Sequence, residues 1–310
     1  MSALICGSMA FDTIMVFHDH FKNHILPEQV HILNVSFLVP ELRREFGGCA
    51  GNIAYNLNLL GGEGKPMATV GADFAPYAEW MDKTGVSRDH IRVIDGSYTA
   101  QAYITTDQDD NQITAFHPGA MNNAQDVKVD ECSDCTLGIV SPDGRQGMID
   151  HAEQFQAKGI PFIFDPGQGM PMFDGDSLTR FVDQATWLAF NDYEAKLMEE
   201  RTGLSPEQMA ERVEAVIITR GGEGSSIYTR DKVYEIPTAP TASLEDPTGC
   251  GDAYRAGLLY GLMNDLEWET TGRIAALMGA IKIEQAGTQN HSFTRDEFDA
   301  RFEAAFGYSL

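Results

Sequence analysis

The second half of the chain alternates short apolar runs with longer segments of helical periodicity. Strands are expected at residues 137–140, 161–165 and 187–190, and helices near 146–158 and 178–184. This βαβ alternation places the strands parallel in one sheet, because each crossover helix brings the chain back to the end of the sheet from which it started. The sequence therefore predicts an α/β fold in which a mainly parallel central sheet is flanked by helices.

The first half of the chain predicts a buried first strand and a hairpin. Residues 4–6 form an apolar run that leads into a glycine turn. Alternating segments at 98–105 and 113–116 flank the polar turn 107–111, which is typical of a β-hairpin. At 310 residues the chain is long enough to bury a full core, and α/β folds of this length commonly form one domain. We expect a single domain over residues 1–310.

The composition excludes several classes of partner. The net charge of −24 repels nucleic acid and anionic membranes, and 43% hydrophobic with 22% charged residues indicates a globular protein. No apolar run approaches the ~18 residues that a membrane helix requires. The first residues lack a basic region, so they are interpreted as a strand and not as a signal peptide. We expect no nucleic-acid partner, no membrane partner and a cytoplasmic location.

The cysteines and histidines carry no recognisable metal motif. An odd number of cysteines, five, favours a reduced compartment. Cys132 and Cys135 have thioredoxin or zinc spacing, but no second Cys or His pair at ligand spacing accompanies them. We interpret them as two incidental thiols in a polar loop. Four early histidines match no zinc spacing either: His18, His20, His24 and His31.

The stretch from Asp246 to Asp252 combines a glycine turn, a helix start and a carboxylate. The first N–H groups of a helix lack intrahelical partners, so Gly249, Cys250 and Gly251 can aim theirs at one point. With the positive end of the helix dipole, these donors suit a phosphate or a developing oxyanion. We expect the dipole to keep Asp252 ionised, so that it accepts a hydrogen bond from an attacking hydroxyl. The alternative is a plain turn capped by two Asp residues.

This seven-residue stretch resembles the second signature of the ribokinase-like (PfkB) carbohydrate kinase family. In that family the last Asp is the catalytic base, and the amides before it hold the transferring phosphoryl group. Residues 46–61 resemble the first signature, in which paired glycines, here Gly47 and Gly48, and Asn52 grip the substrate's hydroxyls. The resemblance spans nearly the whole chain, and it implies a three-layer α/β/α kinase with a small β lid.

The substrate side of the site is expected near the ends of two strands. Ligands in open α/β sheets bind beyond the carboxyl ends of the strands, and Asp12 follows the first strand closely enough to accept hydrogen bonds from paired hydroxyls. Gln168 lies in the loop that follows another strand. This loop can bring Gln168 to a substrate base or can be a plain turn, and the two interpretations are equally good. The resemblance implies that Gln168 faces the base and that the ribose is bound by Ser8, Asp12, Gly48 and Asn52.

The lid implied by the resemblance comprises about residues 13–46 and 97–118. It covers the substrate and excludes water, which would otherwise compete as phosphoryl acceptor. Phe116 would stack on the adenine. The family usually has a second aromatic on the first lid strand, where this chain has Ala102, and Tyr103 next to it points to the opposite face. We therefore expect weaker or altered base selectivity. The lid is also a candidate surface for a homodimer.

The nucleotide side rests on a motif with two interpretations. Asn191 followed three residues later by Glu194 is a capping box, yet it also resembles the family's Asn-x-x-Glu motif, in which Glu holds Mg²⁺ through water and Asn lies near the phosphates. The resemblance further implies a monovalent cation such as K⁺ near Asp246 and Thr248. It assigns the remaining ATP contacts to Thr219, Gly221, Gly224 and Gly287.

Within the family, the chain is most similar to the bacterial adenosine kinases, through segments such as 116–121 and 253–257. This similarity implies ATP- and Mg²⁺-dependent phosphorylation of the 5′-hydroxyl of adenosine to AMP, a step of purine salvage. The alternatives are a ribokinase-like sugar kinase acting on ribose or fructose, and a kinase of another nucleoside. A catalytically silent ligand sensor on the same scaffold is a further alternative, because fold alone does not fix function.

Overall fold

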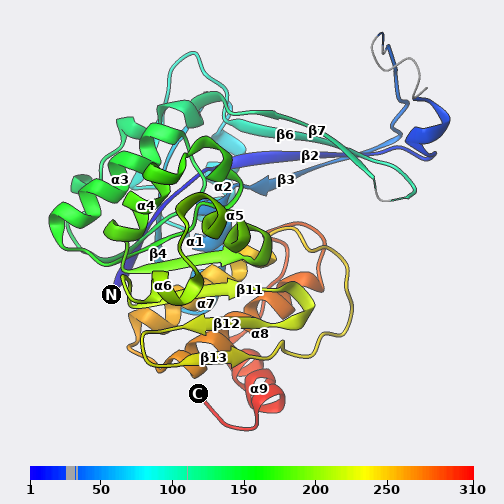
Figure 1. The fold of residues 1–310 in the computed structure, drawn as a ribbon. Coiled ribbons are helices and arrows are strands. Elements are labelled where there is room, and N and C mark those ends of the chain that lie inside the picture. Colours follow the sequence, from blue (N-terminus) through cyan, green and yellow to red (C-terminus); the bar gives the residue numbers. More distant parts are fainter. Residues whose placement is uncertain (26–31, 33, 110) are drawn as a thin grey trace.

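A computed structural model describes residues 1–25, 32, 34–109 and 111–310, which include the large sheet of Figure 1. Within this part of the chain the sheet has the strand order β13-β12-β11-β10-β9-β8-β1-β4-β5. Strands β12 and β13 are antiparallel at one edge, and the other strands are parallel. The predicted, mainly parallel sheet is confirmed. Its strands are β1 (Ser2–Cys6), β4 (Glu63–Val70), β5 (His90–Val93), β8 (Cys135–Val140), β9 (Phe162–Phe164), β10 (Trp187–Asn191), β11 (Ala215–Thr219), β12 (Ser225–Tyr228) and β13 (Val233–Ile236).

Helices cover both faces of this sheet, as Figure 1 shows. Alternate strand residues point to opposite faces. Ile5 therefore packs in one apolar cluster with helices α1, α2, α7 and α8, whereas Leu4 packs in another with α3, α4, α5 and α6. The three-layer α/β/α prediction is confirmed. The helices are α1 (Cys49–Leu59), α2 (Ala75–Thr84), α3 (Arg145–Lys158), α4 (Gly175–Gln184), α5 (Asp192–Thr202), α6 (Pro206–Ala210), α7 (Cys250–Met263), α8 (Trp268–Ile283) and α9 (Arg295–Phe306).

Helices α7 and α8 pack closely because small residues line their contact. A Cβ atom added to Gly257 would lie 2.4 Å from the Cα of Ala275, so only glycine permits this approach. The close packing brings the C-terminal end of α8 to the segment that precedes α7. Glu245 and Asp246 both donate their N–H groups to the carbonyl oxygen of Ile283, at 2.8 and 3.2 Å.

A second, four-stranded sheet has the order β3-β2-β6-β7 and projects from the body of the molecule in Figure 1. The predicted hairpin is confirmed, since β6 and β7 pair antiparallel on either side of the turn. Asp12 lies within β2 and not in a loop after β1, which corrects its expected placement. The strands of this sheet, called the small sheet below, are β2 (Ala10–Val16), β3 (Glu41–Gly47), β6 (Ala100–Thr106) and β7 (Gln112–His117).

The structure shows where the cysteine pair and one of the early histidines lie. Cys132 and Cys135 form a disulfide and are both buried, so their interpretation as incidental thiols in a polar loop is wrong. Near the end of the small sheet, His20 lies 3.0 Å from Asp109. His31 falls outside the described residues.

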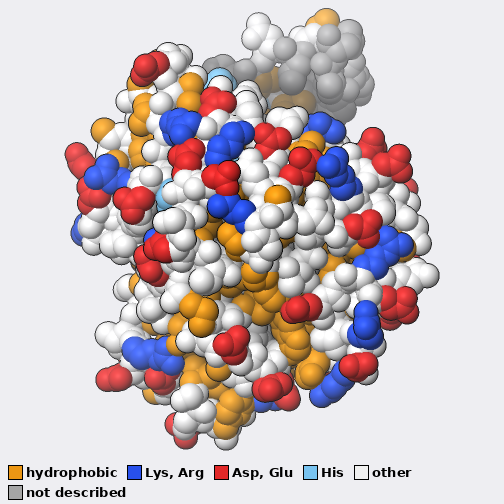
Figure 2. All heavy atoms as spheres, turned by 90° about the vertical axis from the view of Figure 1, so that its left-hand side faces the viewer, with side chains coloured by type: hydrophobic (Ala, Val, Ile, Leu, Met, Phe, Trp, Pro, Cys, Tyr) orange, Lys and Arg blue, Asp and Glu red, His pale blue; other side chains and the backbone are white. Residues whose placement is uncertain are grey.

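The surface carries the charge of the chain in dispersed form. Figure 2 shows acidic and basic side chains interspersed over one face of the molecule. Ion pairs such as Arg180–Glu153, with 2.7 Å between Nη2 and Oε1, contribute to this mixture. In the part of the chain that the structure describes, each helix is too short or too polar to span a bilayer.

Candidate active site

The first turns of α1 and α7 meet at the carboxyl end of the large sheet. Asn52 on α1 donates a hydrogen bond from Nδ2 to Oδ2 of Asp252 on α7, at 2.8 Å. Asn52 is 4% exposed, whereas Asp252 is partly open to solvent. The two sequence signatures, 200 residues apart, therefore converge on one carboxylate that a ligand can reach.

A hydrogen-bond chain holds the Asn52 amide in place. Its Oδ1 accepts from Nε2 of Gln289 at 2.9 Å, and the same Nε2 also donates to the Tyr77 hydroxyl at 2.7 Å. The other end of Gln289 accepts from Nε1 of Trp80 at 2.9 Å. With both ends of its amide engaged, Asn52 keeps one orientation and presents its N–H to Asp252. The sequence analysis assigned no role to Gln289, because a lone polar residue after a helix carries no motif.

Burial changes the acidity of Asp252. Desolvation raises its pKa to about 7, and the negative charge of Asp165 adds to the rise, while the hydrogen bond from Asn52 and the charge of Arg255 oppose it. The helix dipole was expected to keep Asp252 ionised, but desolvation outweighs it here and raises the pKa of this carboxyl above its ordinary value. A base with a pKa near neutrality is well matched to accept a proton at physiological pH.

A buried ion pair lies next to Asp252. Nε and Nη2 of Arg255 bind the two carboxylate oxygens of Asp165 at 3.0 and 3.1 Å, and both residues are less than 7% exposed. The pair ties the end of β9 to the second turn of α7. Sequence reasoning did not place either residue in the site. The available signal was Arg255 itself, a single charge inside an apolar helix, which demands a buried partner.

The turn before α7 offers fewer free amides than predicted. Gly249 has φ 80° and begins the helix without a side-chain cap. The Cys250 N–H donates to the Pro247 carbonyl oxygen at 3.2 Å, so it is already engaged. Among the described residues, the N–H groups of Gly249 and Gly251 have no acceptor. These two amides, at the positive end of α7, are the donors available to an anion.

The register of the small sheet places the proposed sugar and base contacts on one face. Asp12 pairs with Ala102 of β6, which in turn pairs with Phe116 of β7, and directly paired residues share a face. Tyr103 pairs with Ala115 and lies on the opposite face, as predicted. Phe116 is 52% exposed, so its ring is free to stack on a ligand. Desolvation and the nearby acids raise the pKa of Asp12 to about 6.

The remaining predicted substrate contacts surround the start of α1. Gly48 has φ 86° and lies so close to Met9 and Ala10 that no side chain fits. The Ser8 hydroxyl accepts a hydrogen bond from the Cys49 N–H at 3.2 Å. Gln168 is exposed in the short helix that follows β9, without a hydrogen bond among the described residues.

The Asn191–Glu194 motif forms the predicted capping box. Oδ1 of Asn191 accepts from the Glu194 N–H at 2.7 Å, and Oε2 of Glu194 accepts from the Asn191 N–H at 2.8 Å. The second oxygen of Glu194 has no partner in the described part of the chain, so this carboxylate has an atom left for a water molecule on Mg²⁺. Burial and the charge of Asp165 raise its pKa.

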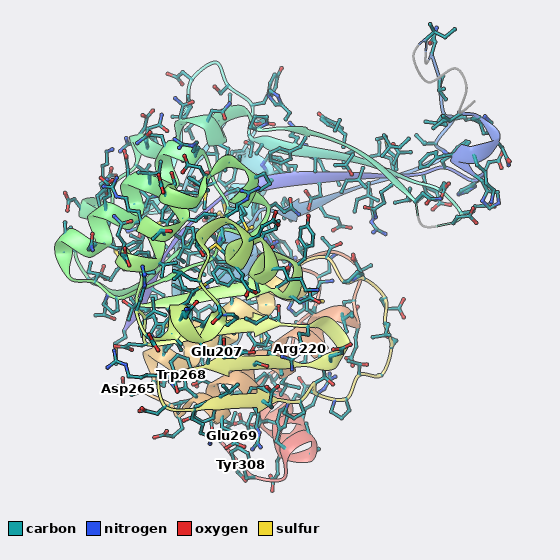
Figure 3. All side chains as sticks on the ribbon, viewed as in Figure 1. Glu207, Arg220, Asp265, Trp268, Glu269 and Tyr308 are labelled. Atoms are coloured by element: carbon teal, nitrogen blue, oxygen red, sulfur yellow. A yellow bond between two sulfur atoms is a disulfide. The ribbon has the colours of Figure 1, made fainter. Side chains whose placement is uncertain are left out.

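The predicted ATP-contacting turn follows β11. Thr219 ends the strand, and Gly221 and Gly224 adopt φ values of 52° and 87° that side chains rarely allow. Between the glycines and the strand, Arg220 is held by Glu235 at 2.8 Å, and Figure 3 shows it at the opposite end of the sheet from Trp268.

The expected K⁺ site near Asp246 and Thr248 does not fit the atoms present. The Asp246 carboxylate accepts from the N–H groups of Thr248 and Gly287, both at 2.9 Å. Its carbonyl oxygen accepts from the ammonium of Lys282 at 2.7 Å. A K⁺ bound to the same carbonyl would lie close to that ammonium, and like charges ~4 Å apart repel by ~4 kcal/mol near a protein surface. The N–H group of Gly287 is therefore engaged by the Asp246 carboxylate.

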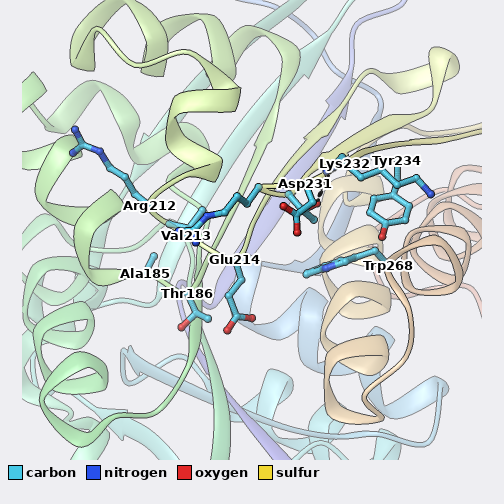
Figure 4. A pocket seen from close by; sticks show the side chains of 11 residues that line it. Ala185, Thr186, Arg212, Val213, Glu214, Asp231, Lys232, Tyr234 and Trp268 are labelled. Atoms are coloured by element: carbon cyan, nitrogen blue, oxygen red, sulfur yellow. Dashed lines mark hydrogen bonds between the residues drawn. The ribbon is translucent and has the colours of Figure 1, made fainter.

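A separate groove lies far from these residues. It has a volume of about 700 Å³ and is lined from the amino ends of β10 and β11, including Thr186 and Glu214, and by Trp268 (Figure 4). The candidate site is at the carboxyl ends of the same strands. The groove is therefore not part of it.

Comparison with known proteins identifies the family. Residues 9–295 match the pfkB family of carbohydrate kinases, and this span covers most of the chain. The chain belongs to this family, and it has the ribokinase fold. It is a phosphotransferase that acts on a hydroxyl group.

Three relatives illustrate the similarity. The structure of Burkholderia thailandensis nucleoside kinase in complex with inosine has 55% sequence identity and a TM-score of 0.91, over 99% of both chains. The nucleoside kinase of Methanocaldococcus jannaschii is 29% identical over 272 residues, which cover 87% of this chain and 89% of that protein. Sinorhizobium meliloti adenosine kinase, at 20% identity and a TM-score of 0.76 over 93% and 95% of the chains, shares the fold.

The two raised carboxylate pKa values predict how phosphotransfer depends on pH. In the roles expected from the sequence, Asp252 would have to be ionised to accept a proton, and Asp12 would have to be ionised to bind two substrate hydroxyls as an acceptor only. The kcat/KM of the free enzyme should therefore rise with pH up to about 7 and then level off, with a steeper fall below about 6. Initial rates at subsaturating acceptor would measure this profile. An Asp12→Asn variant should lose the steeper lower branch and keep the upper one, and a flat profile from about pH 5 to 8 would contradict both assignments.

Proposed function

We propose that this protein is a nucleoside kinase that transfers the γ-phosphoryl group of ATP to the 5′-hydroxyl of purine nucleosides, with adenosine and inosine as acceptors. The observation that carries the proposal is the Asn52–Asp252 contact, which joins a hydroxyl-binding helix to a carboxylate of raised pKa beside two free amides. The relative with 55% identity is a nucleoside kinase solved in complex with inosine. Conversion of adenosine to AMP would return a salvaged purine to the nucleotide pool.

The proposed reaction uses the chain's own groups in fixed roles. Asp12, Ser8 and the α1 start bind the ribose hydroxyls, so that the 5′-hydroxyl points at Asp252. Asp252 orients this hydroxyl in line with the γ-phosphorus and takes its proton. The amides of Gly249 and Gly251 and the positive end of α7 stabilise the charge on the transferring group. The bond from the γ-phosphorus to the bridging oxygen breaks as the bond to the 5′-oxygen forms, so ADP leaves with the bridging oxygen, the phosphoryl group ends on the nucleoside, and the proton ends on Asp252.

The nucleotide would lie on the other side of the cleft. Thr219, Gly221 and Gly224 bring backbone groups close to ATP, and Gly287 lies near its adenine. Glu194 and Asn191 keep free atoms after forming their capping box, and Glu194 would hold Mg²⁺ through water. When bound there, Mg²⁺ would neutralise charge on the β- and γ-phosphates. In an acidic chain such local groups must replace a general positive field.

Asp252→Asn tests the base. General base catalysis typically contributes about 10²–10⁴-fold, so kcat should fall by that factor while the binding of adenosine and ATP stays near normal. The control is Asp265→Asn, an exposed residue just beyond the other end of α7. An ADP-release assay over adenosine, inosine, ribose and fructose would report both variants and the acceptor. Turnover with ribose or fructose but with neither nucleoside would favour the sugar-kinase alternative. No turnover with any of the four acceptors would refute the proposed kinase activity.

The small sheet is proposed to act as the lid, and Phe116, on the same face of this sheet as Asp12, is proposed to set base selectivity. Phe116 offers one exposed ring on the Asp12 face, and its cross-strand partner Ala102, which is 9% exposed, offers none. A base that stacks on one ring only is held less selectively than a base between two rings, which is why inosine is proposed beside adenosine.

Ala102→Phe should lower the KM for adenosine about 5-fold, because an aromatic pair contributes about 0.5–1.5 kcal/mol. The residue directly faces Phe116 across two strands, so the new ring would reach the same ligand face. Ala102→Val adds bulk without a ring and is the matched control. Steady-state kinetics would compare the two variants. Equal KM changes for both would show that ring stacking does not select the base.

A homodimer through the small sheet is part of the proposal. The face opposite Asp12 exposes Leu42, Tyr103 and Ile113, which are 63%, 42% and 44% accessible. Exposed apolar side chains gathered on one face suit a protein partner. Light scattering should give twice the 34.1 kDa chain mass, and Leu42→Asp combined with Tyr103→Asp should give the single mass. A wild-type monomer at micromolar concentration would contradict the dimer.

A further inference from the structure

Lys282 places a positive charge where the family resemblance implies a free K⁺. The residue is in the last turn of α8 and is 0% exposed, so its whole side chain is buried. Its Nζ donates hydrogen bonds to the carbonyl oxygens of Asp246, at 2.7 Å, and Gln285, at 3.0 Å. A buried ammonium requires such acceptors, because desolvation of a charge without partners is costly.

The two acceptors come from different segments of the chain. Asp246 precedes the turn that begins α7, and Gln285 follows α8. The ammonium therefore links the loop before the catalytic helix to the loop that leads to Gly287, and Asp246 strengthens the link by accepting from the Gly287 N–H. Carbonyl oxygens that converge on one cation from two loops are the arrangement by which proteins hold K⁺.

The usual role of a lysine at the end of a helix explains only one of the two Lys282 hydrogen bonds. Lysines near a helix end often bind the last carbonyls of their own helix, and the Gln285 contact is of this kind. Asp246 is 36 residues from Lys282 in sequence and lies in the segment just before α7, so the end of α8 alone does not account for this contact. The ammonium is also close enough to α7 to lower the pKa of the Cys250 thiol, against a larger rise from burial.

We propose that Lys282 is a built-in monovalent cation, a positioning residue that fixes the 246–249 turn and makes phosphotransfer independent of K⁺. A fixed ammonium has the charge of K⁺ and binds the same class of ligand, carbonyl oxygen. It needs no ion from solution and excludes one by repulsion. Its action on the reaction passes through the turn, because it holds the segment from which the Gly249 and Gly251 amides point. The inference depends on the proposed kinase activity, but not on which nucleoside is the acceptor.

The first test is the response of the wild-type enzyme to ions. Adenosine phosphorylation would be measured with Mg·ATP in tetramethylammonium chloride, with KCl replacing it at constant ionic strength. The expected change in kcat and in KM is less than about 2-fold, since the cation is already present. Activation by K⁺ of about 10-fold or more would overturn the proposal. A wild-type enzyme without any turnover would instead refute the proposed function, so the two failures are distinct.

The second test creates the cavity that a free ion could fill. Lys282→Ala should lower kcat about 10- to 100-fold in tetramethylammonium chloride, because small misplacements of reacting groups have effects of this size. K⁺ or NH₄⁺ should restore activity, and Li⁺ should not. The matched control is Lys158→Ala, which also removes a lysine from the last turn of a helix, but one that pairs at the surface with Asp130.

A structural readout separates positioning from simple loss of stability. The melting temperature of Lys282→Ala should rise more in KCl than in tetramethylammonium chloride, whereas that of the wild type and of Lys158→Ala should be equal in the two salts. Lys282→Arg keeps a cation at this position and replaces the alanine variant in the test if that variant does not fold. The activity of Lys282→Arg should not change when K⁺ is added. A Lys282→Ala enzyme that keeps full activity, or that loses activity without ion-selective recovery, would overturn the proposal.

Discussion

The hydrogen bond from Asn52 to Asp252 is the contact on which the site depends. It joins the first turns of α1 and α7, so the positive ends of the two helices lie next to each other. The bond holds because Gln289, Tyr77 and Trp80 fix the other end of the Asn52 amide. A base held by rigid helices keeps its position relative to a substrate more accurately than one on a loop.

An acidic chain can bind an anionic cosubstrate only through a few cations and backbone amides that lie close to the binding site. With a net charge of −24, the protein has no general attraction for phosphate. Arg255 in α7 and Lys282 in α8 are both buried, and each is held by a fixed acceptor, the Asp165 carboxylate and the Asp246 carbonyl oxygen respectively. The charge of Arg255 opposes the effect of Asp165 on Asp252, while burial still raises the pKa of Asp252 to about 7.

Sequence reasoning succeeded where the signal was local. The capping box at Asn191 and Glu194 forms as its spacing predicts, and the 98–116 region forms the expected hairpin. It failed where the signal was a single residue. Arg255 and Lys282 are single charged residues within apolar helices, and no motif indicates their buried partners. Cys132 and Cys135 were interpreted as incidental thiols because no second Cys or His pair accompanies them, yet they form a disulfide. Each of these depends on a neighbour that packing supplies.

The sequence by itself determined the type and order of the elements, the three layers and the family, because hydrophobic periodicity and short motifs are properties of neighbouring residues. Only the tertiary structure decided which polar atoms meet. Asn52 with Asp252, Asp165 with Arg255 and Asp246 with Lys282 are pairs 200, 90 and 36 residues apart. Their acidity and their partners follow from burial and contact, which exist only once the helices have packed on the sheet.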